Sequence, residues 1–381
     1  MNVNPYAFDK HQWSVDASQS KTYAIRVCQS LLDPENPTLL EVGEDRKRRL
    51  VVVDKGLPDE TVSRINRYFR LNLIDIHMIQ VAGGERSKEL GILQKLLDAF
   101  HSFDLNRRTQ PIILFGGGAV LDVCSLAAGI YRRGVPFVKV PTTLLAYIDA
   151  SVGVKTAINF ADGKNLVGSF TPPTAVLLDT AFFQSQEPVE IISGLGEVLK
   201  LAVGCDATLL EHLRISAPEF HRGQFASSNV TALLWRSIDI MLRELQGNLF
   251  EDQLARAVDL GHSFSQTLEL GNVGEAMRHG EAVAIDVIIS SIISARRGLL
   301  GWAAVERIIS TARVLQLPLS LRGVPLARLW RSVCERTLHR GGRQRMPLPG
   351  PLGHCHFIDD LTEDELQEAV VQFNCLANAS A

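Results

Sequence analysis

Charged and amide side chains are concentrated in one otherwise apolar stretch, between Gly116 and Gly168. A glycine run, Gly116–Gly118, follows the apolar segment Pro111–Phe115, and glycine lets backbone N–H groups approach a pyrophosphate closely. A plain tight turn is the alternative, but three glycines before a helix each carry an entropic cost. Buried charge is costly unless it is paired or contacts a ligand. We therefore expect an active site for an anionic, polyhydroxylated substrate and a dinucleotide, and its polar members are Arg133, Asp149, Lys155, Lys164 and Asn165.

The elements that must position these residues alternate in the first half of the chain. The sequence predicts helices at Pro58–Tyr68 and Lys88–Phe103. Strands alternating with helices indicate parallel βαβ units, in which ligands bind at the carboxyl ends of the strands. The predicted strands are Arg49–Asp54, His77–Val81, Pro111–Phe115, Phe137–Val140 and Ala175–Asp179.

The second half of the chain is a succession of long apolar-periodic segments, which predicts a helical domain. We place the boundary near 181–188, which gives an α/β domain at 1–183 and a helical domain at 184–381, with the binding site in the cleft between them. A short hairpin is expected within 342–358, and the tail CLANASA is expected to fray. The predicted helical segments are Pro188–Val203, Ala207–Ile215, Val230–Leu245, Leu254–Leu270, Glu281–Arg297 and Ala303–Leu315.

Composition excludes several classes of protein. The chain has 381 residues, of which 46% are hydrophobic and 21% charged, and its net charge of −3 offers no basic face for nucleic acid. No apolar run reaches the length of a membrane span, so no membrane partner is expected. Six cysteines without a CxxC pair indicate reduced, mostly buried thiols in a cytoplasmic protein.

Six motifs in a fixed order make the chain resemble the sugar phosphate cyclases, the superfamily of 3-dehydroquinate synthase. The resemblance implies a Rossmann-like α/β domain followed by an all-α domain, a dehydroquinate synthase-like fold, and a homodimer. It covers nearly the whole chain and is more specific than a lone glycine-rich loop. The motifs are GGERSK (83–88), the 116–168 stretch, GLGEVLK (194–200), LGHSFSQTLE (260–269), RHGEAV (278–283) and HRGGRQRMPLPGPLG (339–353).

The same resemblance implies a metal site of Glu197, His262 and His279 that holds Zn²⁺, or Co²⁺ in its place. Spacing alone does not predict this site, because a single histidine on an apolar helix is more often a satisfied core residue. Two imidazoles and one carboxylate leave coordination positions open, which is typical of a catalytic site. A zinc ion there would bind adjacent substrate oxygens and ease alkoxide formation.

An NAD⁺ site is the second implication of the resemblance. Asp54 ends a strand and is expected to bind a ribose hydroxyl, although it could instead cap the helix that follows. Glu85 could equally be a favourable charge in a first helical turn. The residues implied at the cofactor are Asp54, Glu85, Lys88, Gly117, Gly118, Asp122, Thr142, Thr143, Asp149, Lys155 and Lys164.

A sugar phosphate is the substrate that the resemblance implies. Matching positions bind its phosphate or hydroxyls, and Arg132 is expected to be solvated instead. Lys200 lies one helical turn after Glu197, so an ion pair between these two residues is the alternative to a substrate contact. The implied reaction oxidises an alcohol with NAD⁺, eliminates phosphate, returns the hydride and closes the ring by an aldol step. The matching positions are Arg133, Lys155, Asn165 and Lys200, with Asp149 between cofactor and substrate.

Departures from dehydroquinate synthases indicate which cyclase this is. Where those enzymes carry an Arg and an Asn for the substrate carboxylate, this chain has Ala255 and Asp259, with Arg256 displaced by one residue. A carboxylate without a cation would be desolvated and unpaired, so the chain resembles the sedoheptulose 7-phosphate cyclases more. Asp259 and His339 match the pattern of 2-epi-5-epi-valiolone synthases, and demethyl-4-deoxygadusol synthases match less well.

Gln266 leaves the stereochemical outcome open. It stands where the sedoheptulose 7-phosphate cyclases more usually carry a proline, and we expect it to face the pocket one helical turn beyond His262. A 2-epi-valiolone synthase is therefore an alternative. The sequence also leaves open a 3-dehydroquinate synthase, an NAD- and metal-dependent polyol dehydrogenase, and a non-enzymatic binding protein, although the last would be expected to have lost these ligands.

Overall fold

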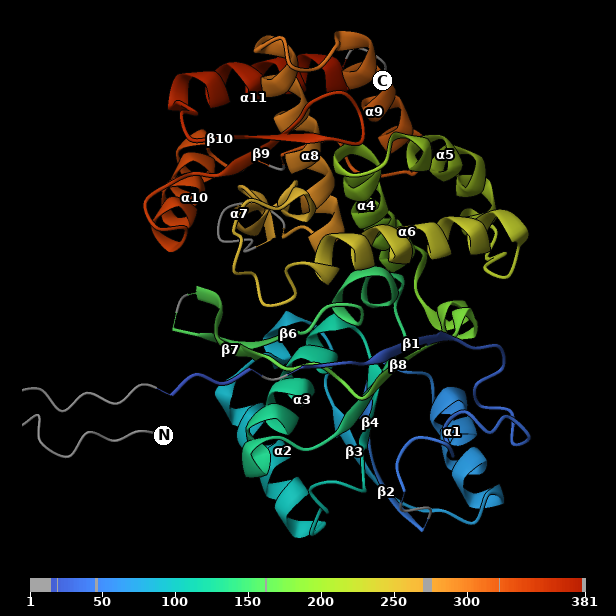
Figure 1. Ribbon diagram of the computed structural model, residues 1–381. Coiled ribbons are helices and arrows are strands. Elements are labelled where there is room, and N and C mark those ends of the chain that lie inside the picture. Colours follow the sequence, from blue (N-terminus) through green and yellow to red (C-terminus); the bar gives the residue numbers. More distant parts are fainter. Residues whose placement is uncertain are drawn as a thin grey trace, which may run out of the picture.

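The computed structural model describes residues 15–18, 20–44, 47–161, 163–269, 276–321 and 323–378, without the side chain of His339. It has an α/β half and a helical half, one above the other in Figure 1. The 3₁₀ turn Thr180–Ser185 connects them, close to the predicted boundary.

A parallel six-stranded sheet in the order β1-β8-β5-β4-β2-β3 forms the centre of the α/β half. Five of its strands confirm the predicted ones, with ends shifted by one or two residues. Strand β1 was not predicted, because only four residues pair with β8 and most of them are exposed, so no apolar pattern marks it. The strands are β1 (Ala24–Val27), β2 (Arg48–Asp54), β3 (Asp75–Val81), β4 (Ile112–Gly116), β5 (Phe137–Pro141) and β8 (Ala175–Leu178).

Helices cover both faces of this sheet. Successive side chains of a strand point to opposite faces, so neighbouring valines of β2 enter different cores. Val52 packs in a cluster with Phe100 of α2 (Leu90–Ser102) and Leu121 of α3 (Gly118–Ile130). Val53 packs in a second cluster with Phe69 of α1 (Asp59–Leu71). Helices α1 and α2 correspond to the two helices that the periodicity predicts.

Three neighbouring strands end together at the edge of the sheet below the helical half. They are β5, β4 and β2, which end in Pro141, Gly116 and Asp54. Two features that the sequence did not predict follow there. They are a π-helical turn, Ala146–Ala150, and a separate antiparallel hairpin of β6 (Lys155–Phe160) and β7 (Gly163–Phe170). A short 3₁₀ turn at Glu85–Ser87 completes this edge, whereas the 3₁₀ turn Tyr131–Arg133 follows α3 and precedes the start of β5.

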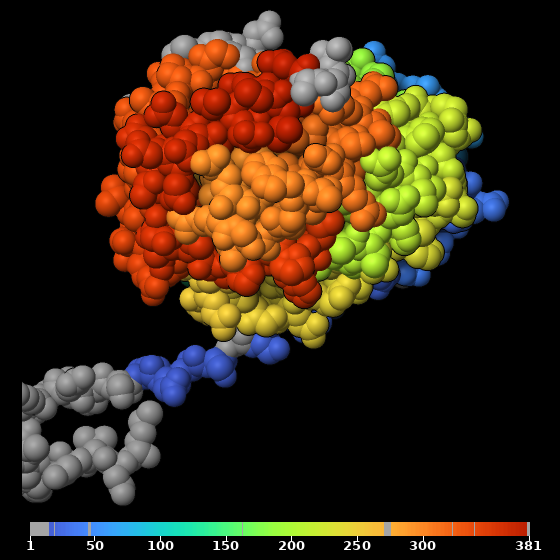
Figure 2. All heavy atoms as spheres, turned by 90° about the horizontal axis from the view of Figure 1, so that it is seen from above, coloured from blue at the N-terminus to red at the C-terminus, as the bar shows by residue number. Residues whose placement is uncertain are grey.

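The second half is helical apart from the hairpin predicted within 342–358, which is formed by β9 (Met346–Pro349) and β10 (Cys355–Ile358). Figure 2 shows this half from above, with green to red segments covering the face and blue ones at its margin. Its helices are α4 (Pro188–Gly204), α5 (Ala207–His221), α6 (Ser228–Gln246), α7 (Ser265–Glu269), α8 (His279–Arg296), α9 (Trp302–Val314), α10 (Leu326–His339) and α11 (Glu363–Asn378).

Two predictions about this half were wrong. The segment Leu254–Leu270 is not one helix, because Gly261 takes a φ of 79° and separates the 3₁₀ turn Ala257–Asp259 from α7. A Cβ at Gly261 would lie 2.8 Å from a Val283 methyl carbon, so close packing and backbone conformation both require glycine there. The tail does not fray from Cys375, because residues 375–378 belong to α11, and residues 379–381 lie outside the described part.

The expectation of mostly buried thiols was also wrong. All six cysteines are free, but only Cys124 is buried, and two are exposed. No helix among the described residues is long and apolar enough to cross a membrane.

Candidate active site

Helices α4 and α8 cross backbone to backbone, and this crossing positions the first two metal candidates. A Cβ at Gly196 would lie 2.0 Å from the Gly280 carbonyl oxygen, so only glycine allows the approach. The backbone N–H of Gly280 donates to Ser193 Oγ at 3.1 Å. Glu197 and His279 are the neighbours of these glycines in sequence, so the same contact brings them together.

His262 reaches the same point from the segment between the 3₁₀ turn Ala257–Asp259 and α7. Its Nδ1 lies 3.2 Å from the Leu260 carbonyl oxygen, which leaves Nε2 directed at Glu197. The segment is held to α8 by buried Asp286, whose Oδ2 accepts the backbone N–H groups of Phe264 at 2.7 Å and Ser265 at 3.0 Å.

The three metal candidates meet in a compact cluster. Their ligand atoms all lie within 4.8 Å of one another. Glu197 Oε1 is 2.9 Å from His279 Nε2 and 3.7 Å from His262 Nε2. Two imidazole nitrogens and one carboxylate oxygen that converge in this way fit the donor set of a catalytic zinc site.

Charge around the cluster favours an ionised Glu197. Burial alone would raise its pKa, but Lys200 and the two histidines outweigh burial and hold the pKa well below its ordinary value. Burial lowers the pKa of His262 to about 4, so its ring is neutral and able to bind a metal. Lys200 forms an ion pair with Glu197 Oε2, which is the alternative that the sequence left open. Both partners are buried.

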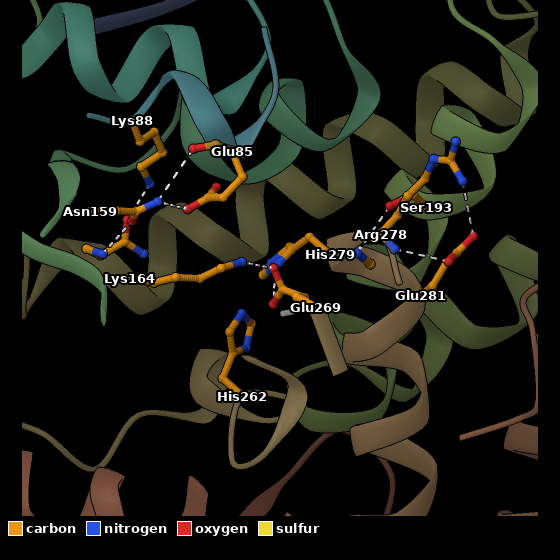
Figure 3. Close-up of polar contacts among 12 residues, drawn as sticks. Glu85, Lys88, Asn159, Lys164, Ser193, His262, Glu269, Arg278, His279 and Glu281 are labelled. Atoms are coloured by element: carbon orange, nitrogen blue, oxygen red, sulfur yellow. Dashed lines mark hydrogen bonds and ion pairs between the residues drawn. The ribbon is translucent and has the colours of Figure 1, made fainter. Parts of the chain in front are cut away.

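Glu269 is a member of this site that the sequence analysis did not single out. Its Oε1 lies 3.1 Å from His279 Nδ1, on the far side of that ring from Glu197, and its Oε2 accepts from Lys164 at 2.8 Å. Figure 3 shows Glu269 between His279 and Lys164, which comes from the hairpin. Metal-binding histidines commonly donate their second nitrogen to a carboxylate, which fixes the ring. The sequence signal that could have identified Glu269 was its position at the end of the LGHSFSQTLE motif.

The glycine-rich turn after β4 forms a cradle with Asp54. Gly117 precedes α3 as its N-cap residue, and Gly118 is the first residue of the helix. The Asp54 carboxylate lies against Gly83, where an added Cβ would come within 2.6 Å of Oδ1. Asp54 does not cap α1, because the N-cap position is Pro58, but its Oδ1 accepts the Gly56 N–H at 2.8 Å. Thr143 packs against Gly117, where an added Cβ would lie 3.2 Å from its Cγ2.

Lys88 connects a predicted cofactor residue, Asp122, to a predicted substrate residue, Asn165. Its ammonium is 2.8 Å from Asp122 and donates to the Asn165 side chain, so it links α3 to the hairpin. Glu85 is exposed, and its Oε1 accepts from Asn159 of β6 at 2.9 Å. Thr142, also a predicted cofactor residue, is buried and donates its N–H to Gly116 at 3.0 Å.

The residues predicted at the substrate come from both halves of the molecule. Lys155 of β6 pairs with Glu251 of the helical half at 3.1 Å. Asp149 lies in the π-helical turn Ala146–Ala150, within the electrostatic influence of buried Lys200. Arg133 is exposed on a left-handed backbone with a φ of 62°. Its neighbour Arg132 donates to the Leu105 carbonyl at 2.9 Å, and its side chain is 43% exposed.

Asp259 is buried in a cluster of arginines. Arg256 and Arg340 form ion pairs with it, and Arg336 lies 3.5 Å away. Burial alone would raise its pKa, but the three arginines outweigh burial and lower the pKa to about 2. Arg256 also pairs with Glu251, so Asp259 and Glu251 both bind it.

Gln266 and His339 are the remaining residues by which the sequence distinguishes among the cyclases. Gln266 is exposed on α7, and because His262 lies before this helix the two are not on one helical face as expected. His339 is the last residue of α10, and its side chain lies outside the described part of the structure.

Comparison with known proteins agrees with this geometry. The family model described as 3-dehydroquinate synthase N-terminal matches residues 78–193, and the one described as 3-dehydroquinate synthase C-terminal matches residues 194–335. A 2-epi-5-epi-valiolone synthase from an Actinomyces species is 37% identical over 94% of this chain and 97% of its own length. The chain belongs to the 3-dehydroquinate synthase family. The expected dehydroquinate synthase-like fold is thereby confirmed.

Other members of the 3-dehydroquinate synthase family are also similar along their whole length. A 2-epi-valiolone synthase from Actinosynnema mirum is 30% identical over 95% of this chain and 94% of its own. The 2-epi-5-epi-valiolone synthase of Streptomyces hygroscopicus subsp. jinggangensis, solved with NAD⁺ and Zn²⁺ bound, superposes with a TM-score of 0.91. That structure is 33% identical and aligns over 95% of this chain and 99% of its own.

Proposed function

We propose that this enzyme is a sedoheptulose 7-phosphate cyclase that forms 2-epi-5-epi-valiolone and phosphate, a carbon–oxygen lyase. The observation that carries this proposal is the ionised Asp259 with its three arginines. A dehydroquinate synthase must accept a substrate carboxylate at this side of the pocket. Here Arg256 is engaged by Asp259 and Glu251, and Asp259 offers only acceptor oxygens where the Asn of those enzymes can donate an amide N–H to a carboxylate. A hydroxymethyl group carries no charge and is tolerated.

The proposed cofactors are NAD⁺ and Zn²⁺, or Co²⁺. Bound NAD⁺ supplies a reversible hydride acceptor, and the divalent cation at Glu197, His262 and His279 supplies a Lewis acid for substrate oxygens. Asp54 and the glycine turn Gly116–Gly118 bind the dinucleotide in this proposal.

Two cationic side chains and one amide of this chain bind the substrate phosphate in this proposal. Lys155 and Asn165 lie on the hairpin β6–β7, and Arg133 lies in the 3₁₀ turn that follows α3. They bind the phosphate and stabilise its charge as it leaves. Asp149, in the turn between the two halves, orients the reacting hydroxyl. Lys200 holds Glu197 ionised, so that the metal cluster keeps its carboxylate.

The test is incubation of the purified protein with sedoheptulose 7-phosphate, NAD⁺ and a divalent metal. We expect released phosphate and a seven-carbon cyclitol ketone, identified by NMR, with no accumulation of NADH. Consumption of 3-deoxy-arabino-heptulosonate 7-phosphate instead would show that Ala255 and Asp259 do not exclude a carboxylate. Stoichiometric NADH would indicate a polyol dehydrogenase.

A 2-epi-valiolone synthase is the second candidate, because Gln266 stands where a proline is more usual among the sedoheptulose 7-phosphate cyclases. The coupling constants of the product distinguish the two epimers. The homodimer and the cytoplasmic location stay predictions, and light scattering of the purified protein tests the dimer.

A further inference from the structure

Lys139 is a charged residue buried in the centre of the sheet, away from the metal cluster. It lies in β5 between Val138 and Val140, and none of its surface is exposed. Its ammonium donates to the carbonyl oxygens of Ala150 and Gly153, each at 3.0 Å. An apolar side chain would fill this space without the cost of burying an ammonium. What lysine adds at this position is therefore its two hydrogen bonds.

The Ala150 carbonyl is the last of the π-helical turn Ala146–Ala150, and the Gly153 carbonyl lies three residues beyond that turn. Within that turn the Ser151 N–H donates to the Ala146 carbonyl at 2.9 Å, the wide spacing of a π-helix. Such turns are uncommon and are frequently found at functional sites. The last carbonyls of any helix lack partners within the helix, and Lys139 supplies one to Ala150. We propose that Lys139 is a positioning residue that fixes this turn, and through it Asp149 and the glycine turn at the proposed cofactor site.

The contacts of the turn explain how its position reaches the site. Asp149 is the residue immediately before Ala150, so a shift of the Ala150 carbonyl moves Asp149 as well. A Cβ at Gly118 would lie 3.3 Å from the Ala150 Cβ, so the turn packs against the start of α3. Displacement of the turn therefore disturbs both Asp149 and the glycine turn, which lie at the substrate and at the cofactor of the proposed hydride transfer.

The charge of Lys139 is poised to change near neutral pH. Burial lowers the pKa of Lys139 to about 8, and Asp122 from α3 and Asp149 from the π-helical turn oppose this shift. Asp122 is itself paired with Lys88. The ammonium is thus present below about pH 8 and lost above it, and its two carboxylate neighbours then lose a compensating charge.

The experiment compares Lys139→Met, which is neutral and similar in length, with Lys139→Arg, which stays charged. The first readout is the NAD⁺ dissociation constant by calorimetry between about pH 6 and about pH 10, which needs no sugar substrate. The second is kcat from phosphate release, which rests on the proposed function. Lys95→Met, on the exposed face of α2, controls for the loss of a lysine.

We expect Lys139→Met to weaken NAD⁺ binding and lower kcat by about tenfold each, as small displacements at a reacting centre do. Wild type should bind NAD⁺ more weakly above about pH 8 than below it. This weakening should be absent from the Met variant and move to higher pH in Lys139→Arg. Unchanged affinity and pH profile in both variants would overturn the inference. If the Met variant does not fold, the pH profiles of wild type and Lys139→Arg decide.

Failure of the proposed function is distinguishable from failure of this inference. A wild-type protein that binds NAD⁺ but releases no phosphate contradicts the cyclase, and Lys139 is then judged on NAD⁺ affinity alone. A wild-type protein that does not bind NAD⁺ overturns the inference about Lys139.

Discussion

Asp259 is a buried carboxylate whose pKa is controlled by the arginines around it. Its three arginines lower its pKa from the ordinary 3.8 to about 2, against the effect of burial. A carboxyl with a depressed folded-state pKa contributes stability that is present above the unfolded value and is lost as pH falls through the folded value. Here that window runs from about pH 4 down to about pH 2, and the contribution is about 2 kcal/mol.

Replacing Asp259 by Ala should therefore destabilise the protein at neutral pH, because three arginines lose their shared partner. We expect a loss of about 3 kcal/mol in the free energy of unfolding by urea. The products from sedoheptulose 7-phosphate should change more than the NAD⁺ dissociation constant. Asp259→Asn keeps the shape without the charge and is the matched control. An unchanged product in both variants would show that Asp259 does not control the outcome.

His279 gives a second test at this scale. His279→Ala removes one of three ligand atoms and should abolish turnover together with bound metal, measured by atomic emission. Exposed His101→Ala, on α2, is the control and should keep both. Activity retained with full metal content would contradict the assignment of His279 as a ligand.

Individual residues of the site were predictable only where a motif carried them. The three metal candidates stood in recognisable motifs, and the structure brings them together. Glu269, Asp286 and Lys139 were missed because each acts through a contact between elements distant in sequence. The partner of Lys139, for instance, is a backbone carbonyl, which leaves no trace in the residue types.

One buried carboxylate, that of Asp286, connects two elements of the helical half. Asp286 joins the His262 segment to α8, and burial raises its pKa from the ordinary 3.8 to about 6. A carboxyl with a raised folded-state pKa takes up a proton on folding between those two values. Its ionisation therefore makes the folded state less stable as pH rises from about 4 to about 6, by about 3 kcal/mol.

Asp286→Asn should remove this pH dependence. The amide oxygen can still accept from Phe264 and Ser265, so the fold is kept. We expect the free energy of unfolding of wild type minus that of the variant to fall by about 3 kcal/mol between about pH 4 and about pH 6.5. Chemical denaturation at several pH values measures this difference. A difference that does not vary with pH would show that Asp286 does not titrate in this range.

The regular elements were more predictable than the irregular ones. Five strands and seven of the eight predicted helical segments follow from apolar periodicity. The hairpin β6–β7 lacked that signal, because most residues of β7 are exposed and only two residues of β6 are buried. The π-helical turn Ala146–Ala150 was missed because its apolar residues divide between the two halves of the molecule.

At the scale of the whole molecule, the two halves share contacts beyond the connecting segment. Tyr147 of the π-helical turn belongs to the same buried cluster as Leu195 and Val198 of α4. Lys155 and Lys164 of the hairpin pair with Glu251 and Glu269 of the helical half. The hairpin that carries the predicted phosphate ligands Lys155 and Asn165 thus also connects the two halves.

Glu269 connects the hairpin to the metal cluster, since one oxygen faces Lys164 and the other faces His279. Glu269→Gln should weaken zinc binding by about tenfold, measured by competition with a chromophoric chelator, because a carboxylate that orients a ligating histidine is lost. Lys164→Met removes only the link to the hairpin. It should raise the KM for the sugar phosphate and leave zinc affinity within about twofold of wild type.

Glu190→Gln is the matched control for these two variants. Glu190 pairs at 2.8 Å with Arg278, the residue before His279, but this pair is about half exposed and should contribute little. Zinc affinity should therefore fall in the order Glu190→Gln, Lys164→Met, Glu269→Gln, with only the last clearly weaker than wild type. Equal losses in the Lys164 and Glu269 variants would instead mean that the hairpin itself holds the metal cluster together. The link between the two halves would then be a requirement for metal binding, because the ligands would depend on the hairpin being docked.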